Sequence, residues 1–337
     1  MKCQSTALRT VLIFYAMALA LWPATNYPAS VKGEIVTIIS PNSAGGMMTR
    51  YARMIAPYIS KYSGARDVRV KIMTGAGGIK GTNFLWFSKP DGKTIAFTSI
   101  PSLILAQLSG SEAVQFDATQ FVYLGRAATE PRVLTVGINS NISTIDDIRN
   151  LTRPFIFPSQ GTDEDFYTMA VLAEALNIEL KVISGYNGNA DTALAVIKGD
   201  GDGHITSWDA SMAIIQAGDE LPILSLSRQR QSAYPGVPTA GEAVSEESRS
   251  IIEAIVNMLD MRRGFFAPPG MESTTASELR TAISKALADP DLISESEDRG
   301  LPLLPSDGLT EQRKIVQITK SSEIIVPILQ EALMAIR

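Results

Sequence analysis

Short apolar runs rich in β-branched residues alternate with segments of helical periodicity along most of the chain. Residues 34–40 predict a strand, and residues 47–62 predict a helix because Tyr51, Ile55 and Ile59 recur on one face. Alternation of this kind predicts βαβ units, and therefore an α/β fold of mostly parallel sheets flanked by helices. The same pattern predicts further strands at residues 68–73, 94–98, 133–137, 155–157, 181–183, 203–206, 223–226 and 264–267, and further helices at 80–87, 163–176, 190–198 and from 273 onward.

Two proline-containing segments mark places where the chain could cross between lobes. They are Glu130-Pro131-Arg132 and residues 234–239. A chain of 337 residues exceeds the usual size of one domain. We therefore predict that residues 30–131 and 237–337 form lobe 1 and that residues 132–236 form lobe 2. Two crossings imply a hinge with a cleft beside it.

The first 29 residues have a different composition from the rest. Lys2 and Arg9 are basic, and residues 11–22 form an apolar run of 12, shorter than the ~20 that a membrane-spanning helix needs. Small residues follow this run. Residues 1–29 therefore predict a secretory signal peptide, cleaved near Ala20 or Ala29, and an exported protein. A non-cleaved anchor is the alternative.

Composition excludes several classes of function. The formal charge is −5, which argues against nucleic acid as a partner. The chain has one cysteine and one histidine, so a disulfide scaffold, a zinc site and most thiol or imidazole catalysis are not expected. We predict no metal, no cofactor and no enzymatic activity, and composition favours binding.

The first candidate site is the loop between the strand at 34–40 and the helix at 47–62. Ligands of open α/β sheets bind at the carboxyl ends of strands. The amides of the next helix's first turn lack helical partners and form a site for anions. An ordinary glycine-rich turn is the alternative. The residues expected to bind are Asn42, Ser43, Ala44, Gly45, Gly46 and Met47.

A second loop has the same strand–turn–helix arrangement in the other lobe. It comprises Gln160, Gly161, Thr162 and Asp163. Thr162 or Asp163 could instead cap the following helix. One loop from each lobe could face the other across the cleft and grip one anion. Further candidates for the wall of the cleft, with helix capping as the alternative, are Tyr186, Trp208 and Asp209.

Other motifs do not complete a recognisable site. The glycines at residues 75–81 lack the spacing of a dinucleotide fingerprint, and residues 91–94 lack the leading glycine of a phosphate-binding loop. Asp200 and Asp202 lie in a turn without the full ligand set for calcium. His204 lies in an apolar strand pattern, where a structural role is expected.

Several segments together resemble the Bug family, the extracytoplasmic solute receptors of tripartite tricarboxylate transporters. The matching pieces follow one another in order over nearly all of the exported chain: Gly45-Gly46, residues 52–57, residues 75–78 with Gly81, Pro90-Asp91-Gly92, Gly161-Thr162, Tyr186-Asn187-Gly188, and residues 234–239, 264–270 and 286–290.

The resemblance implies a two-lobed periplasmic binding protein, type II-like and of the Venus-flytrap kind. It implies a monomer that holds a small organic acid between residues 43–47 and 160–163, largely through main-chain amides, and delivers it to the membrane subunits of a transporter. The sequence departs from the family pattern at Met47, Thr49 and Asp165, where a glycine, an acidic residue and a histidine are usual. The identity of the ligand therefore cannot be transferred from other members of the family.

Two alternatives remain open from the sequence. A secreted hydrolase could use the same cleft, with His204 as its one available imidazole. A sensor subunit that feeds a membrane signalling protein would bind a ligand in the same way as a transport receptor.

Overall fold

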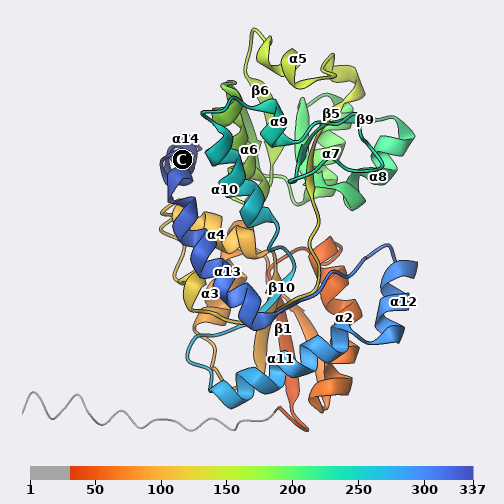
Figure 1. The fold of residues 1–337 in the computed structure, drawn as a ribbon, viewed down its shortest axis with the longest axis vertical. Coiled ribbons are helices and arrows are strands. Elements are labelled where there is room, and N and C mark those ends of the chain that lie inside the picture. Colours follow the sequence, from red (N-terminus) through yellow and green to blue (C-terminus); the bar gives the residue numbers. More distant parts are fainter. Residues whose placement is uncertain (1–30, 337) are drawn as a thin grey trace, which may run out of the picture.

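The computed structural model describes residues 31–336, so the predicted signal peptide at 1–29 lies outside the described residues. Figure 1 shows two lobes, one above the other, with several helices running along the side that joins them. Lobe 1 is built on a six-stranded sheet with the order β11-β4-β10-β3-β1-β2. Its strands are β1 (Ile35–Ser40), β2 (Asp67–Ile72), β3 (Thr94–Thr98), β4 (Val122–Arg126), β10 (Gly264–Ala267) and β11 (Ser306–Asp307).

The upper lobe in Figure 1 corresponds to the predicted lobe 2. It contains a three-stranded sheet of order β8-β5-β9 and a separate pair, β6-β7. Its strands are β5 (Arg132–Gly137), β6 (Phe155–Ser159), β7 (Leu180–Ser184), β8 (Gly203–Ser207) and β9 (Glu220–Leu226). The α/β class is confirmed.

Both lobes contain more antiparallel pairing than the mostly parallel sheets that the alternation predicts. Strands β1, β2 and β3 are parallel to one another, as are β6 and β7. Strand β10 is antiparallel to β3 and β4, and β5 is antiparallel to β8 and β9. The reason is topological, because β5 and β10 are the strands that enter a sheet from the opposite lobe. The first residue of each of these two strands therefore pairs with the last residues of the neighbouring strands.

Helices cover the sheets on both faces. Helix α2 (Met47–Ser63) begins directly after the first candidate loop, buries Tyr51, Ile55 and Ile59 completely, and ends at Gly64, whose φ of 70° suits a left-handed C-cap. The remaining helices are α3 (Ile79–Trp86), α4 (Ile100–Leu108), α5 (Ile145–Arg149), α6 (Glu164–Leu176), α7 (Asn189–Lys198), α8 (Trp208–Ala217), α9 (Ala240–Ala243), α10 (Arg249–Leu259), α11 (Ser273–Leu287), α12 (Pro290–Asp298), α13 (Gly308–Ser321) and α14 (Val326–Ala335).

The chain passes from lobe 1 to the upper lobe between β4 and β5. Helices α9 and α10, which follow the second predicted crossing, still contact β9 and α6 of the upper lobe. The chain rejoins the six-stranded sheet at β10, directly after Arg263. The boundary at 236/237 stays a prediction, and the described contacts favour a return nearer residues 259–264.

The two lobes share an apolar core along one side. One cluster of buried residues joins Leu103 and Phe121 of lobe 1 to Leu134, Phe157 and Phe166 of the upper lobe. Helices α4, α6, α10 and α14 contact one another around this cluster. Within residues 31–336 no helix has both the length and the apolar character needed to cross a bilayer.

Candidate ligand-binding site

The first predicted loop lies at the edge of lobe 1 that faces the other lobe. The side chain of Thr98, at the end of β3, donates a hydrogen bond to Asn42 Oδ1 at 2.8 Å. Arg53 Nη1 donates to the carbonyl of Ala44 at 3.0 Å. The first bond holds the loop against the end of β3, and the second holds it against α2.

The amino end of α2 is open to an anion. Its N-cap is Gly46, no side chain caps it, and its first turn contains no acidic residue. The first helical hydrogen bond runs from the Arg50 amide to Gly46 O at 3.1 Å. The amides of Met47 and Met48 therefore precede the helical ladder and are donors for an anion. A Cβ on Gly46 would lie 2.9 Å from Ser43 Oγ and 3.3 Å from Ser43 O, so a side chain there would crowd the first loop.

The second loop differs, because its own side chains occupy the helix end. Asp163 is the N-cap of α6 and accepts a hydrogen bond from the Phe166 amide at 3.0 Å. The capping alternative is therefore confirmed for Asp163. Gln160 Nε2 donates to Asn189 Oδ1 at 2.6 Å, and Gly161 has a φ of 123°. Glu164 and Asp165 add two more acidic groups in the first turn of α6.

The two lobes touch beside this second loop. Gly77 has a φ of 61°, and a Cβ there would lie 2.6 Å from the carbonyl oxygen of Thr162. Such a distance is shorter than real Cβ contacts, so only glycine allows this approach. The glycine segment at 75–78, which does not fit a nucleotide site, thus brings lobe 1 against the second loop.

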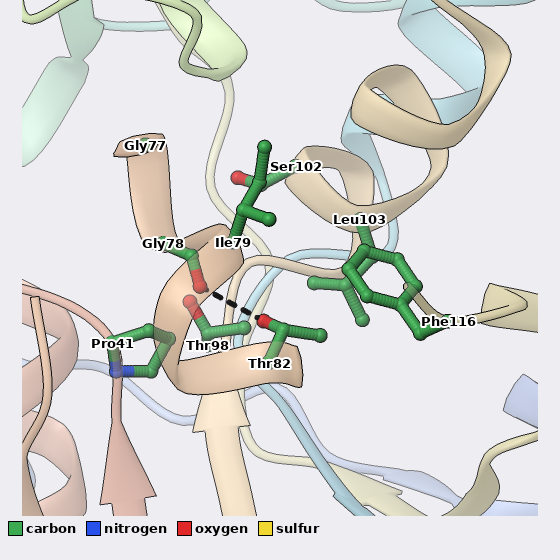
Figure 2. Close-up of a pocket in the computed structure, with 9 residues that line it drawn as sticks. All are labelled: Pro41, Gly77, Gly78, Ile79, Thr82, Thr98, Ser102, Leu103 and Phe116. Carbon is green, nitrogen blue, oxygen red and sulfur yellow. Dashed lines mark hydrogen bonds between the residues drawn. The ribbon is translucent and has the colours of Figure 1, made fainter. Parts of the chain in front are cut away.

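Figure 2 shows a small cavity in lobe 1 between the first loop and α4. Its volume is about 10 Å³, which is space for one water molecule at most. An organic acid needs more room than this cavity offers. The residues around it are Pro41, Gly77, Gly78, Ile79, Thr82, Thr98, Ser102, Leu103 and Phe116.

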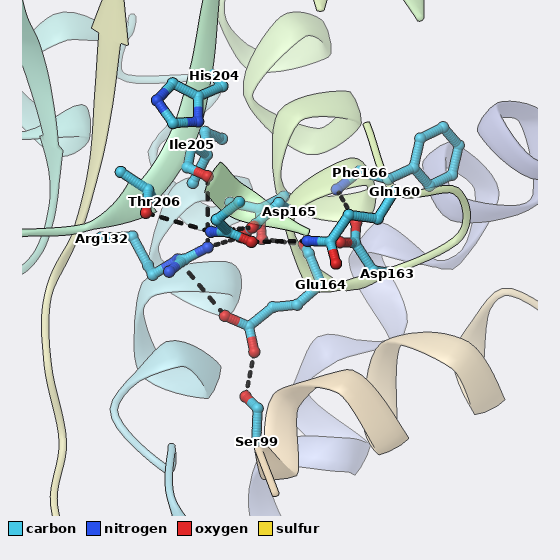
Figure 3. Close-up of polar contacts among 12 residues, drawn as sticks. Ser99, Arg132, Gln160, Asp163, Glu164, Asp165, Phe166, His204, Ile205 and Thr206 are labelled. Atoms are coloured by element: carbon cyan, nitrogen blue, oxygen red, sulfur yellow. Dashed lines mark hydrogen bonds and ion pairs between the residues drawn. The ribbon is translucent and has the colours of Figure 1, made fainter. Parts of the chain in front are cut away.

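A buried cluster of charges links the lobes next to the two loops (Figure 3). Glu164 accepts a hydrogen bond from Ser99 of lobe 1 and pairs with Arg262 Nε at 3.2 Å. Arg132 pairs with Glu164 at 3.6 Å and also with Asp165. Sequence reasoning missed this cluster because its members are far apart in the chain.

Burial shifts the acidity of groups in this region. Desolvation raises the pKa of Asp163 to about 6, although part of its surface reaches solvent. Burial, and then the positive charge of Arg262, lower the pKa of Arg132 to about 9. Within residues 31–336, Asp163 forms no ion pair, whereas Glu164 and Asp165 are both paired.

A second polar cluster lies at the crossing between the lobes. Arg263 pairs with Glu130 and donates to Tyr51 Oη at 2.9 Å. Glu130 Oε1 accepts from the Asp209 amide at 3.0 Å. Partial desolvation and the nearby Glu130 raise the pKa of Asp209 to about 6, although much of the residue reaches solvent. Burial opposes ionisation of Glu130 itself, but Arg263 and Arg262 hold its pKa below the ordinary value.

The predicted wall residues lie in three different settings. Trp208 is buried and stacks on Tyr234 at 5.0 Å between ring centroids, so it supports the wall from within the lobe. Asp209 is exposed in the first turn of α8, and the N-cap of that helix is Ser207, so the capping alternative for Asp209 is wrong. Tyr186 is half-buried, and its amide donates to Ser159 O at 3.3 Å.

His204 has the structural position that the sequence predicts. It is 2% exposed, with Nδ1 3.1 Å from Thr192 Oγ1 and Nε2 3.1 Å from Glu220 Oε2. An imidazole enclosed in this way is not accessible to a substrate. In the part of the chain covered by the structure, no three His, Cys, Asp or Glu side chains are grouped to hold a metal ion.

Comparison with solved structures shows that the fold is that of two-lobed periplasmic binding proteins. The periplasmic binding protein BugD superposes with a TM-score of 0.72 at 20% identity, over 88% of this chain and 97% of that chain. MatC from Rhodopseudomonas palustris with bound malate gives 0.72 at 18% identity, over 87% and 99%. An R. palustris protein with adipate gives 0.71 at 18% identity, over 92% and 98%.

The model of the tripartite tricarboxylate transporter family receptor matches residues 51–328, so the chain belongs to this family. It is 27% identical to the UPF0065 protein in the tcbD-tcbE intergenic region of Pseudomonas sp. (strain P51), over 79% of this chain and 77% of that protein. It is 25% identical to the UPF0065 protein in the gbd 5' region of Cupriavidus necator, over 82% and 81%. The family and the fold are those of solute-binding receptors, which favours neither a hydrolase nor a sensor subunit.

Proposed function

We propose that this receptor captures a small organic carboxylate between its two lobes in the periplasm and delivers it, as a monomer, to the membrane subunits of a tripartite transporter. The observation that carries the proposal is the open amino end of α2, in the lobe whose Gly77 lies against Thr162 of the second loop. The malate and adipate bound to the two R. palustris neighbours support an acid as the ligand.

The ligand carboxylate accepts hydrogen bonds from the first-turn amides of α2. Each hydrogen bond to a charged group contributes about 1.5–3 kcal/mol, and a helix end adds ~0.3–1 kcal/mol. Three or four such bonds, less the cost of association, give roughly −8 kcal/mol, a micromolar affinity. The residues proposed to form the site are Asn42, Ser43, Ala44, Gly45, Gly46, Met47, Gln160, Gly161, Thr162, Asp163, Tyr186, Trp208 and Asp209.

Binding requires the lobes to move apart and close again. The cavity beside the first loop has room for one water molecule at most, and Gly77 already lies against the second loop. The proposed hinge lies at the two crossings, where the Glu130–Arg263 pair joins both chain segments. The shared core on the side of α6, α10 and α14 limits the motion to an opening on the opposite side.

A thermal-shift panel of mono-, di- and tricarboxylates tests the proposal. At one hundred times its dissociation constant, a bound acid adds ~2.7 kcal/mol of apparent stability. Gly46→Val should abolish the shift, because a Cβ there meets Ser43 Oγ at 2.9 Å. Gly241→Val is the matched control, since a Cβ at Gly241 meets nothing within 4 Å and Gly241 lies outside both loops and both predicted crossings. If no acid alters the melting temperature of the wild-type protein, the proposed function is wrong.

A further inference from the structure

Glu164 stands between the two halves of the proposed site. It directly follows Asp163 of the second loop, and its side chain reaches across to lobe 1 (Figure 3). There Ser99 donates to Oε2, and Ser102 donates to the same oxygen at 3.4 Å. Ser99 is the neighbour of Thr98, which holds Asn42 of the first loop. The Glu164 carboxylate is therefore next to both loops.

The groups around this carboxylate form an anion site. Two hydroxyl donors come from α4 and its N-cap, Ser102 and Ser99. Two guanidinium groups approach the other oxygen, Arg262 at 3.2 Å and Arg132 at 3.6 Å. The side chains of Arg132, Arg262 and Glu164 are 3%, 9% and 6% exposed. Two hydroxyls and two arginines are the donors that carboxylates prefer.

Several buried atoms of this site have hydrogen-bonding capacity left over. Among residues 31–336, no hydrogen bond reaches Arg132 Nε, Arg262 Nε, Arg262 Nη1 or Glu164 Oε1. The guanidinium groups face Glu164 at ion-pair distance without hydrogen-bond geometry. Buried donors of this kind are costly unless a partner completes them. The arginines of this site therefore have more hydrogen-bond donors than the Glu164 carboxylate satisfies.

We infer that Glu164 is a resident carboxylate that fills the second anion position of the cleft, so that the receptor selects a monocarboxylate over a dicarboxylate. This inference rests on the proposed function, since it assumes that the first carboxylate of a ligand binds at the amino end of α2. The second carboxylate of a diacid would then meet a position already occupied by the protein.

Charge balance supports this selection. Arg132 and Arg262 are matched by Glu164 and Asp165, so the cluster has no positive charge to spare. Asp163, adjacent in the chain, forms no ion pair within the described part of the chain. A second ligand carboxylate would be repelled by these acidic groups, whereas an uncharged amide of the same shape would not.

The test uses calorimetric titration of adipate and its half-amide, which differ in charge but little in shape. The wild-type receptor should bind the half-amide at least about tenfold more tightly. Glu164→Ala removes a carboxymethyl group and leaves Arg262 without its carboxylate partner, while Arg132 keeps Asp165, so it should reverse this preference. Glu174→Ala, on an exposed part of the same helix, is the matched control and should keep the wild-type preference.

Glu164→Gln keeps the shape and removes the charge, and it serves if Glu164→Ala does not fold. Glu164→Gln should lower the ratio of the affinity for the half-amide to the affinity for adipate. The inference is overturned if the wild-type protein binds adipate as tightly as the half-amide, or if neither substitution changes the ratio of the two affinities. If the wild-type protein binds no acid of either charge in this panel or in the thermal-shift panel, the proposed function itself fails.

Discussion

At the scale of single residues, the acidic groups of the second loop define how the site responds to pH. Asp163 caps α6 but lacks an ion pair within the described residues, and burial raises its pKa to about 6. Arg132 and Arg262 neutralise the neighbouring Glu164 and Asp165 instead. The second loop is therefore a less favourable place for an anion than the first loop, and the difference depends on the protonation of one carboxyl.

Asp163→Asn should change how stability depends on pH. A carboxyl whose folded pKa is about 6 and whose unfolded pKa is near 4 binds more protons in the folded state between these values. Its contribution to stability is therefore lost as pH rises from about 4 to 6. Asparagine also caps helices but does not titrate. Urea unfolding should show the variant gaining roughly 1–2 kcal/mol relative to the wild-type protein from pH 4 to 7.

The measured quantity is the difference in unfolding free energy between the variant and the wild-type protein, so the contributions of the other titrating groups cancel. Glu174→Gln removes one charge from an exposed part of α6 and should follow the wild-type profile. A constant offset between Asp163→Asn and the wild-type protein over this range would show that Asp163 does not have a raised pKa.

Residue roles differ in how far the sequence reveals them. The capping role of Asp163 follows from local spacing, because a side chain and the amide three residues later are neighbours. Glu164 shows no such signal, since an acid in the first turn of a helix is ordinary. Its partner Ser99 lies 65 positions earlier. Only the fold brings them together.

At the scale of elements, the strands and helices that the pattern predicts start and end close to their observed positions, whereas β4, α4, α5 and α10 are not predicted. Strands β3 and β10 match their predicted bounds, because alternation and turn residues act locally. The direction of β5 and β10 was not predictable, since it depends on crossings between lobes rather than on local pattern. The same applies to α9 and α10, whose packing on the upper lobe leaves no trace in their own periodicity.

The turn that contains Gly77 joins β2 to α3 in lobe 1 and lies against Thr162 of the other lobe, and Gly77→Ala tests the importance of this approach. The added Cβ would lie 2.6 Å from Thr162 O, so the lobes could no longer approach as they do. Ligand affinity should fall by about tenfold or more, as measured by calorimetric titration. The left-handed backbone alone costs an alanine about 1–2 kcal/mol.

Gly300→Ala is a control that separates the effect of backbone strain from the effect of the contact between residue 77 and Thr162. Gly300 has a φ of 60°, close to the 61° of Gly77, but a Cβ there meets nothing within 4 Å. This variant should lose similar stability and keep its ligand affinity. Equal affinities for the two variants would show that the contact between Gly77 and Thr162 has no part in binding.

At the scale of the whole molecule, two lobes share one apolar core and meet again at a polar, glycine-dependent contact. The core along α4, α6, α10 and α14 holds the lobes in register. The contact at Gly77 and the Glu164 cluster lie at the facing edges, where the two candidate loops are placed. Under the proposed function, an anion that joins these edges would stabilise the closed arrangement, and its release would allow the receptor to open.

The position of a bound acid tests this central claim most directly. A crystal structure of the exported chain should be determined with the acid that gives the largest thermal shift. We predict that its carboxylate accepts hydrogen bonds from the amides of Met47 and Met48 and faces residues 160–163 across the closed cleft. An acid bound on an outer face of either lobe, away from both loops, would contradict the claim.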